Sequence, residues 1–446
     1  MSGWSGSSFS GMTYAEKQRL GGSTEEFNPD DILPDFIDSF VKYYYKFYEV
    51  VPEEYIEACA MFAMSAIIGN SLSCNDTSLG YKKCNLLVIL LGPSSVGHKS
   101  MIVTETEKML KATDKVTFLS SRFSIEAMIS DLKDAPSGVF VRDEFTGMMA
   151  EATKSYLSDL KEFLCQIYDC RVEPRSTKKE GRIDPGNICN SLLSATVPEN
   201  LSLKLTIEDS IGGFLPRIVW ICPDFKEQKD IGIKRATDKD MEFKFKLVKT
   251  LMFIHKKFLI DGTDARLTDE AFDVYNRWIL NNSNTVYTAG KDVMAYYARL
   301  VDFLLKVAMI MQVSSTATEV QVKMDNKTKK VTRYIEIQAS VMRKAVKWIN
   351  EYRDVHLNRA LKMLSNRENE RVYNGIKTLL EETEQKEITY SMLLRKLSDL
   401  STDRLRKVVQ TLIDADRIRV RASLRDVGNI KKKTEHISIV KTEDMT

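Results

Sequence analysis

The fold is decided by the stretch from residue 85 to residue 100. It reads Asn85-Leu-Leu-Val-Ile-Leu-Leu91 and continues as Gly92-Pro-Ser-Ser-Val-Gly97-His98-Lys99-Ser100. The first half is an uninterrupted apolar run bounded by turn residues, which is typical of a strand buried on both faces of a parallel sheet. The second half is rich in glycine and serine and leads into a segment with helical character. Together they predict a strand, a tight loop and a helix within an α/β fold.

The composition of this loop suits the binding of a nucleoside triphosphate. Such a site needs backbone N–H groups aimed at phosphate oxygens, a helix N-terminus behind them, a lysine for the outer phosphates and a hydroxyl for Mg2+. The ordinary loop has its lysine directly after the second glycine, whereas His98 intervenes here, and a plain strand-to-helix turn is the alternative. The residues that we expect to bind the nucleotide are Gly92, Ser94, Ser95, Gly97, Lys99 and Ser100.

Two adjacent carboxylates follow a second apolar strand, Gly138-Val-Phe-Val141. At the end of a strand beside a phosphate loop, Asp143 would hold Mg2+ and Glu144 would polarise the attacking water. The alternative is a pair of solvated loop residues. Taken with the loop, the pair predicts ATP and Mg2+ as cofactors, with Ser100 and Asp143 on the metal and with Lys99 and Glu144 as catalytic residues.

Two more strands end or begin with side chains that suit this chemistry. Thr196 closes the apolar run that starts at Ser191, where a hydroxyl could sense the terminal phosphate or orient water, although a small core residue is equally consistent. Arg217 ends a turn just before another apolar run and could neutralise charge at a neighbouring subunit's phosphate. A surface salt bridge is its alternative.

Apolar spacing divides the chain into an α/β core with helical segments around it. Strands at 115–119 and 191–195 and helices at 125–132 and 155–168 alternate after the loop as in βαβ units. The predicted parts are a flexible tail at 1–30, an N-terminal helical region at 31–80, a P-loop ATPase core at 81–225, a helical lid with an inserted ribbon (319–338) at 226–365, and a winged-helix domain at 366–446.

Composition excludes several classes of protein. Hydrophobic residues make up 43% of the 446 residues and charged residues 28%, which is ordinary for a soluble globular protein. The longest apolar stretch has only the length of a strand, so we expect neither a membrane span nor a signal peptide. Seven cysteines without a CxxC pair indicate reduced thiols in a cytoplasmic protein and make a zinc site improbable.

Basic residues gather in places where a DNA-binding protein would carry them, although basic runs are often only solvated faces. A polar hairpin before the last predicted sheet strand contains Arg175, Lys178, Lys179 and Arg182. The C-terminal part carries Arg404, Arg406 and Lys407 on its third helix and Lys431, Lys432 and Lys433 in the region of the wing. Winged helices also serve as protein–protein modules. A third basic patch in the ribbon, from Lys323 to Arg333, suggests no mechanism.

From Leu33 to His356 the chain resembles the phage-, plasmid- and mobile-element-associated P-loop ATPases, often described as a domain of unknown function and often fused to, or encoded beside, primases. That family is similar to the replicative helicases of the minichromosome maintenance and superfamily three kinds within the AAA+ class. The resemblance lies in the Gly92 loop with Lys99-Ser100, the pair Asp143-Glu144, the helix and basic hairpin from Tyr168 to Arg182, the turn at Gly213–Arg217, and Arg299 as the arginine of the helical lid.

The resemblance implies an ATP-driven DNA translocase or helicase, a hexameric ring of identical subunits, that acts in replication of a virus, plasmid or mobile element. Single-stranded DNA would pass the basic hairpin in the pore, duplex DNA would meet the winged helix, and any primase would be a separate chain. Two alternatives stay open: an ATP-switched initiator or loader that binds DNA, and a nucleotide-sensing scaffold without motor activity.

Overall fold

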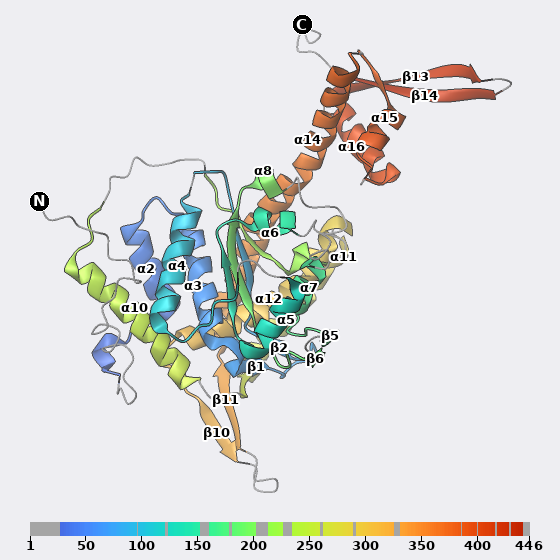
Figure 1. Ribbon diagram of the computed structural model, residues 1–446. Helices are drawn as coiled ribbons and strands as arrows, with labels where there is room; N and C mark the ends of the chain where they lie inside the picture. The colour runs from blue at the N-terminus through green and yellow to red at the C-terminus, as the bar shows by residue number, and fades with distance from the viewer. Residues whose placement is uncertain are drawn as a thin grey trace, which may run out of the picture. The chain divides into compact units, whose positions relative to one another are not determined.

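The computed structural model shown in Figure 1 describes most of the chain. The described residues are 27–95, 97–120, 124–151, 160–177, 181–201, 213–225, 234–258, 262–288, 291–324, 331–384, 386–398, 400–414, 417–427 and 430–439. Contacts between residues divide the chain into two compact units, one of residues 1–197 with 207–358 and one of residues 198–206 with 359–446. The boundaries predicted from the sequence, which are finer, remain predictions.

A four-stranded parallel sheet lies at the centre of the first unit. Its strands are β3 (Leu87–Leu91), β4 (Val139–Arg142), β7 (Ser191–Thr196) and β8 (Val219–Ile221), in the order β4-β7-β3-β8. Each pair is parallel, so the four carboxyl ends meet at one edge of the sheet. The predicted strand at 115–119 is reduced to one parallel bridge between Phe118 and Val139.

Helices cover both faces of this sheet, which explains why β3 is apolar and buried along its whole length. Figure 1 shows α2 (Phe36–Phe47), α3 (Glu53–Ile68) and α4 (Lys99–Thr113) on one face. It shows α5 (Ile125–Asp134) and α7 (Leu160–Tyr168) on the other. Residues 155–159 of the helix predicted at 155–168 lie outside the described residues. A short helix, α6 (Phe145–Glu151), follows β4 directly.

A second sheet in the same unit was not predicted. It contains β1 (Leu72–Cys74), β2 (Lys82–Lys83), β9 (Thr263–Leu267), β10 (Gln321–Met324) and β11 (Val331–Ile337), in the order β10-β11-β9-β1-β2. Its parallel pairing of β1 with β9 joins the predicted N-terminal region to the predicted lid. The antiparallel pair β10 and β11 lies where the sequence predicts a ribbon.

Long helices fill the rest of the first unit, as the apolar spacing predicts. They are α10 (Asp238–Lys257), α11 (Asp269–Thr288), α12 (Lys291–Ser314) and α13 (Ala339–Glu351), followed by a π-helical turn at Tyr352–Leu357. Helix α10 begins at a capping box, because the Thr237 hydroxyl accepts from the backbone N–H of Asp240 while the Asp240 carboxylate accepts from that of Thr237. Short 3-10 turns lie at Pro29–Asp31, Gly69–Ser71 and Leu215–Arg217.

Within its described residues, the second unit combines four helices with a small antiparallel sheet. The elements run in the order α14 (Asn358–Thr383), β12 (Ile388–Thr389), α15 (Tyr390–Lys396), α16 (Thr402–Asp414), β13 (Ile418–Val427) and β14 (Ile430–Ile439), and the sheet order is β12-β14-β13. Leu405, Val409 and Leu412 are buried on α16, and Ile437 is buried on β14. The short helix α8 (Pro198–Leu201) also belongs to this unit.

The prediction of a mixed α/β fold with a parallel sheet and many helices is confirmed. Among the described helices, none combines the length and the apolar character that crossing a membrane requires.

Candidate functional site

The loop between β3 and α4, residues Gly92–Ser100, is here called the glycine loop, and it has an unusual backbone. Ser95, Gly97 and His98 all have positive φ angles, of 61°, 74° and 47°. For residues other than glycine this left-handed conformation costs roughly 1 kcal/mol or more each. His98 occupies the position before the first residue of α4, and its carbonyl accepts from the N–H of Met101. The inserted histidine therefore forms part of a tight, strained turn into the helix.

Lys99 is folded back across the loop. Its ammonium donates to the carbonyl of Gly92 at 2.9 Å and to the carbonyl of Pro93 at 2.6 Å, and the residue is only 8% exposed. Ser94, Ser95 and Ser100 are exposed. The lysine thus lies against the loop itself, while the serine hydroxyls are open to a ligand.

Both glycines of the loop are packed so closely that a side chain would not fit. A Cβ atom on Gly92 would lie 2.5 Å from the Tyr55 hydroxyl and 2.7 Å from the Phe225 ring, and one on Gly97 would also lie 2.7 Å from that ring. Tyr55 donates from its hydroxyl to the carbonyl of Leu91. These contacts give a steric reason for glycine at both positions, in addition to the positive φ of Gly97.

Glu144 follows β4 and is held by two threonines. Its carboxylate accepts from the Thr196 hydroxyl at 2.7 Å and from the backbone N–H of Thr146 at 3.0 Å. The two threonine hydroxyls are 2.6 Å apart. Because Thr196 has one hydroxyl proton and gives it to Glu144, Thr146 must donate to Thr196. Asp143 and Glu144 are both exposed. The two threonines therefore orient the Glu144 carboxylate while it stays accessible to solvent.

The glycine loop and Thr196 are also joined through the backbone, since the N–H of Gly92 donates to the carbonyl of Thr196 at 3.3 Å. The parallel strands therefore bring the predicted loop, the predicted acidic pair and the predicted threonine to one edge of the sheet. In open α/β sheets, ligands bind in the crevice outside this edge.

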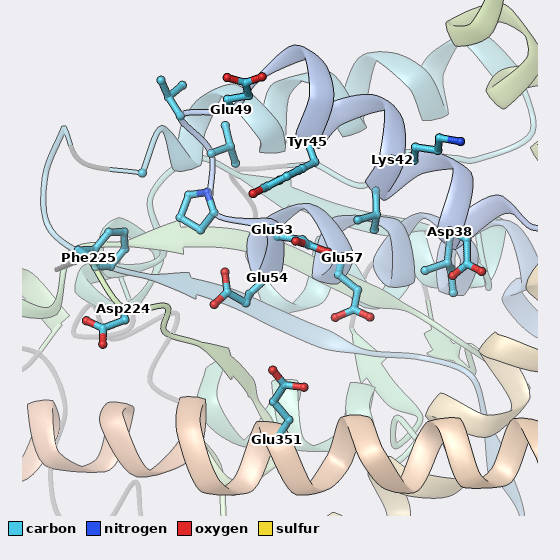
Figure 2. Close-up of a pocket in the computed structure, with 16 residues that line it drawn as sticks. Asp38, Lys42, Tyr45, Glu49, Glu53, Glu54, Glu57, Asp224, Phe225 and Glu351 are labelled. Carbon is cyan, nitrogen blue, oxygen red and sulfur yellow. The ribbon is translucent and has the colours of Figure 1, made fainter. Parts of the chain in front are cut away.

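A cavity of about 850 Å3 opens beside Gly97. Figure 2 shows Glu54 and Glu57 reaching into it from α3, with Glu351 reaching toward them from the opposite side and Asp224 and Phe225 at one end. The full set of carboxylates in its lining is Asp38, Glu49, Glu53, Glu54, Glu57, Asp224 and Glu351. This lining favours neutral or cationic groups that donate hydrogen bonds.

Glu57 has a shifted pKa among the carboxylates that line this cavity. Burial raises its pKa from 4.5 to about 7, the hydrogen bond from the Trp348 indole at 2.9 Å opposes the shift, and the nearby carboxylates of Glu351 and Glu53 add to it. Near neutral pH the group therefore exists in both protonation states.

Arg217 and Arg299 lie together, away from the glycine loop. Arg217 lies just before β8, whose first residue, Val219, pairs with Val88 near the start of β3. About 13 Å of strand separate Val88 from Gly92 at the other end of β3. Its guanidinium donates to the Asp169 carboxylate at 2.7 Å and to the carbonyl of Gly213. Arg299 lies 3.8 Å from the same carboxylate. Within one chain these two predicted residues are thus at the amino edge of the sheet.

The predicted DNA-binding residues fall in both units, on the β5–β6 hairpin, on α16 and on β14, and the structure describes them in part. In the first unit, Arg175 starts β5 (Arg175–Thr177) and the exposed Arg182 lies in β6 (Gly181–Ile183), which pair antiparallel, while Lys178 and Lys179 lie outside the described residues. In the second unit, Arg406 and Lys407 are exposed on α16 and Arg404 is partly buried. Lys431, Lys432 and Lys433 lie in β14, paired with residues of β13.

Sequence reasoning missed several residues of the site. Thr146 lies two positions after Glu144, and Phe225 lies shortly after β8. Both follow the end of a sheet strand, and that position in the sequence could have identified them as site residues. Tyr55 and Asp169 carry no such signal, because each reaches its partner across elements that are distant in sequence.

Comparison of the chain with models of protein families gives no match, and comparison with curated proteins gives no significant match.

Proposed function

We propose that the chain is an ATP-hydrolysing P-loop motor of the AAA+ kind that acts on DNA. The observation that carries this proposal is the bond from Thr196 to Glu144 beside the glycine loop. It orients a carboxylate at the carboxyl edge of a parallel sheet, next to a loop that ends in Lys99 and Ser100. A glutamate so held is suited to accept a proton from water at a phosphate.

The side chains of the site fit ATP with Mg2+. Lys99 would exchange the carbonyls of Gly92 and Pro93 for the outer phosphates, since an anion is a stronger partner for an ammonium than a neutral carbonyl. The hydroxyl of Ser100 and the carboxylate of Asp143 are hard oxygen donors that would hold the metal. Bound Mg2+ would neutralise charge on the phosphates and so assist their transfer. Glu144, fixed by Thr196, would orient and deprotonate the attacking water.

The acidic cavity beside Gly97 is the proposed binding place for the nucleoside of ATP. Its volume of about 850 Å3 lies within the range of ligand sites. Its carboxylates disfavour phosphates but can accept from the amino group of a base, and Phe225 offers a ring face. The phosphates would therefore lie in the glycine loop and the base in the cavity.

The position of Arg217 and Arg299 supports a site shared between copies. Their guanidinium groups lie at the edge of the sheet opposite the glycine loop of the same chain. A head-to-tail assembly that closes into a ring, such as the hexamer implied by the resemblance, would bring this edge to another copy's loop. There an arginine would neutralise charge that develops during hydrolysis.

DNA is the proposed partner because of two basic elements. The β5–β6 hairpin presents Arg175 and Arg182, which suit the backbone of a single strand in a pore. In the second unit the order of helices and strands is that expected of a winged helix, with Arg406 and Lys407 exposed on the helix that would enter the major groove.

The test is ATP hydrolysis with and without single-stranded DNA. We expect turnover that rises with DNA in the wild type, falls at least ~100-fold in Glu144→Gln, and is lost in Lys99→Ala. Lys111→Ala is the matched control, because Lys111 is an exposed lysine on the same helix α4. Turnover that ignores DNA would favour a nucleotide switch or scaffold, and Glu144→Gln with wild-type turnover would refute the assigned site.

A further inference from the structure

Two cysteines outside the proposed nucleotide site lie against each other, one on each side of the β5–β6 hairpin in the chain. Cys170 follows α7, and Cys189 lies two positions before β7. The Cys189 thiol is hydrogen-bonded to the sulfur of Cys170. A short approach would bring the two sulfur atoms to the S–S bond length of ~2 Å. The two residues are therefore placed as the members of a disulfide pair would be.

Hydrogen bonds fix the backbone beside both cysteines. The side-chain amide of Asn85, just before β3, donates to the carbonyl of Tyr168 at 3.0 Å. The ammonium of Lys83 donates to the carbonyl of Ile188 at 2.6 Å. Lys83 and Asn85 are two positions apart, so the segments that carry the two cysteines are held close to one short stretch of chain. The contact between the thiols is thus part of the folded core.

Two buried ammonium groups belong to the same cluster. Lys306, on α12, and Lys83 are each 2% exposed. The ammonium of Lys306 donates to the side-chain oxygen of Asn85 at 2.8 Å and to the carbonyl of Tyr168 at 3.4 Å, which are neutral acceptors. Burial lowers the pKa of Lys306, and the charge of a Cys170 thiolate opposes that shift. A buried cation is stabilised by a nearby anion, and a thiolate can supply one here.

The surroundings make Cys170 the more acidic thiol of the pair. The hydrogen bond from Cys189 lowers the pKa of Cys170 to about 7, burial opposes this shift, and the charges of Lys306 and Lys83 add to it. The same hydrogen bond, with burial, raises the pKa of Cys189 well above its usual value. Cys170 is also partly exposed, whereas Cys189 is 2% exposed. Because the thiolate is the nucleophilic form, a small oxidant would react at Cys170 first.

We propose that Cys170 and Cys189 are a redox pair that forms a reversible disulfide when a peroxide oxidises the chain. The Cys170 thiolate bonds to one oxygen of hydrogen peroxide as the O–O bond breaks, which gives a sulfenic acid and hydroxide. Hydroxide takes up the proton that Cys170 lost on ionising. The sulfur of Cys189 then bonds to that of Cys170, the S–O bond breaks, and the hydroxyl leaves as water with the Cys189 proton.

Two thiols and one hydrogen peroxide thus give one disulfide and two waters. The sulfur atoms are oxidised, the peroxide is reduced, and a dithiol reverses the change by thiol–disulfide exchange. Disulfides of this transient kind are the ones that occur in reducing compartments.

The disulfide would close a loop of the chain that contains the β5–β6 hairpin. Both strands of the hairpin lie between the two cysteines in the sequence. A cross-link there restricts the conformations that the enclosed segment can adopt. The chemistry of the pair does not depend on the proposed function, but its consequence bears on it, because this hairpin is the proposed contact with single-stranded DNA.

The test is oxidation of the full-length chain by hydrogen peroxide at pH 7, with a count of free thiols and mass spectrometry of non-reduced proteolytic fragments. The count should fall by two from the seven thiols of the reduced chain and recover with dithiothreitol. The fragments that contain Cys170 and Cys189 should be joined, and Cys170→Ser or Cys189→Ser should abolish the cross-link. An unchanged count, or a cross-link between other cysteines, would overturn the proposal.

Cys165→Ser is the matched control and should keep the cross-link. Cys165 lies on α7 and is partly exposed like Cys170, but burial raises the pKa of its thiol. The same contrast supports a second measurement, the rate of alkylation by iodoacetamide at each cysteine. Cys170 should reach half of its maximal rate near pH 7, and Cys165 only above pH 9. Alkylation of Cys170 at pH 7 that is no faster than that of Cys165 would contradict its role as the reacting thiol.

Neither measurement requires ATP, DNA or a second copy of the chain. A protein without ATPase activity would refute the proposed function while both thiol measurements kept their meaning. A chain that forms no disulfide would refute the redox pair and leave the proposed ATPase site untouched.

Discussion

At the scale of single residues, the candidate site depends on how Glu144 is oriented. Thr196 is 1% exposed and Thr146 is 8% exposed, so their hydroxyls are fixed by packing before any ligand binds. The carboxylate therefore needs little reordering to act, which is the advantage of a preorganised group.

The first prediction concerns this orientation. Thr196→Val keeps the shape of the side chain but removes its bond to Glu144 and leaves the Thr146 hydroxyl without an acceptor. ATP turnover should fall about tenfold or more, because the base is misplaced, while affinity for a non-hydrolysable ATP analogue changes little. Thr113→Val is the control, since Thr113 is equally buried but its hydroxyl bonds only to backbone groups, donating to the carbonyl of Leu110 and accepting from the N–H of Lys115. Wild-type turnover in Thr196→Val would contradict the role assigned to the bond.

The sequence predicts which site residues lie at the ends of strands, but it does not predict contacts between residues that are far apart in the chain. The loop, Asp143, Glu144 and Thr196 each follow an apolar run, so the rule that ligands meet the carboxyl ends of parallel strands identifies them. The pairing of Asp169 with Arg217 joins residues 48 positions apart and follows no periodicity.

At the scale of elements, α3 and α13 meet through one carboxylate. Glu57 on α3 accepts from the Trp348 indole on α13 and is mostly buried. Its pKa lies above the usual value for glutamate, so the folded chain prefers the neutral form.

The second prediction follows from this pKa. Between pH 4.5 and about pH 7 the folded state binds more protons at Glu57 than the unfolded state, so the contribution of Glu57 to stability falls as the pH rises through that window. The shift corresponds to about 3 kcal/mol at most. Glu57→Gln keeps an acceptor for Trp348 and does not titrate.

Urea unfolding at pH values below 4.5 and above 7 measures this effect. The variant should gain stability relative to the wild type as the pH rises, because it avoids burying a charge. A difference between the two proteins that stays constant with pH would show that Glu57 titrates normally in the folded chain.

Elements with long apolar periods were predictable, whereas short ones were not. The spacing of α10, α11, α12 and α13 extends over three or more turns and identifies them as helices. The strands β1 and β2 have only three and two residues. The pairing of β1 with β9, almost two hundred residues later, depends on tertiary packing and leaves no periodic pattern in the local sequence.

At the scale of the whole molecule, the two edges of the central sheet carry what we propose to be complementary halves of one site. The carboxyl edge holds Lys99 and Glu144, and the amino edge holds Arg217 and Arg299. One chain cannot bring these halves together without unfolding the sheet between them. We therefore propose that each complete site forms between two copies of the chain.

Mixing two inactive variants tests that claim most directly. Lys99→Ala chains keep Arg217 and Arg217→Ala chains keep Lys99, so a mixed assembly contains intact sites, roughly a quarter of the total if the copies mix at random. Lys99→Ala mixed with Glu144→Gln is the control, because both defects lie on the same half and no intact site forms.

We predict that ATP turnover is absent from each variant alone, returns when the Lys99→Ala and Arg217→Ala proteins are mixed, and stays absent in the control mixture. Mixtures that remain inactive although the chains assemble, or an Arg217→Ala protein that hydrolyses ATP alone at the wild-type rate, would contradict the shared site.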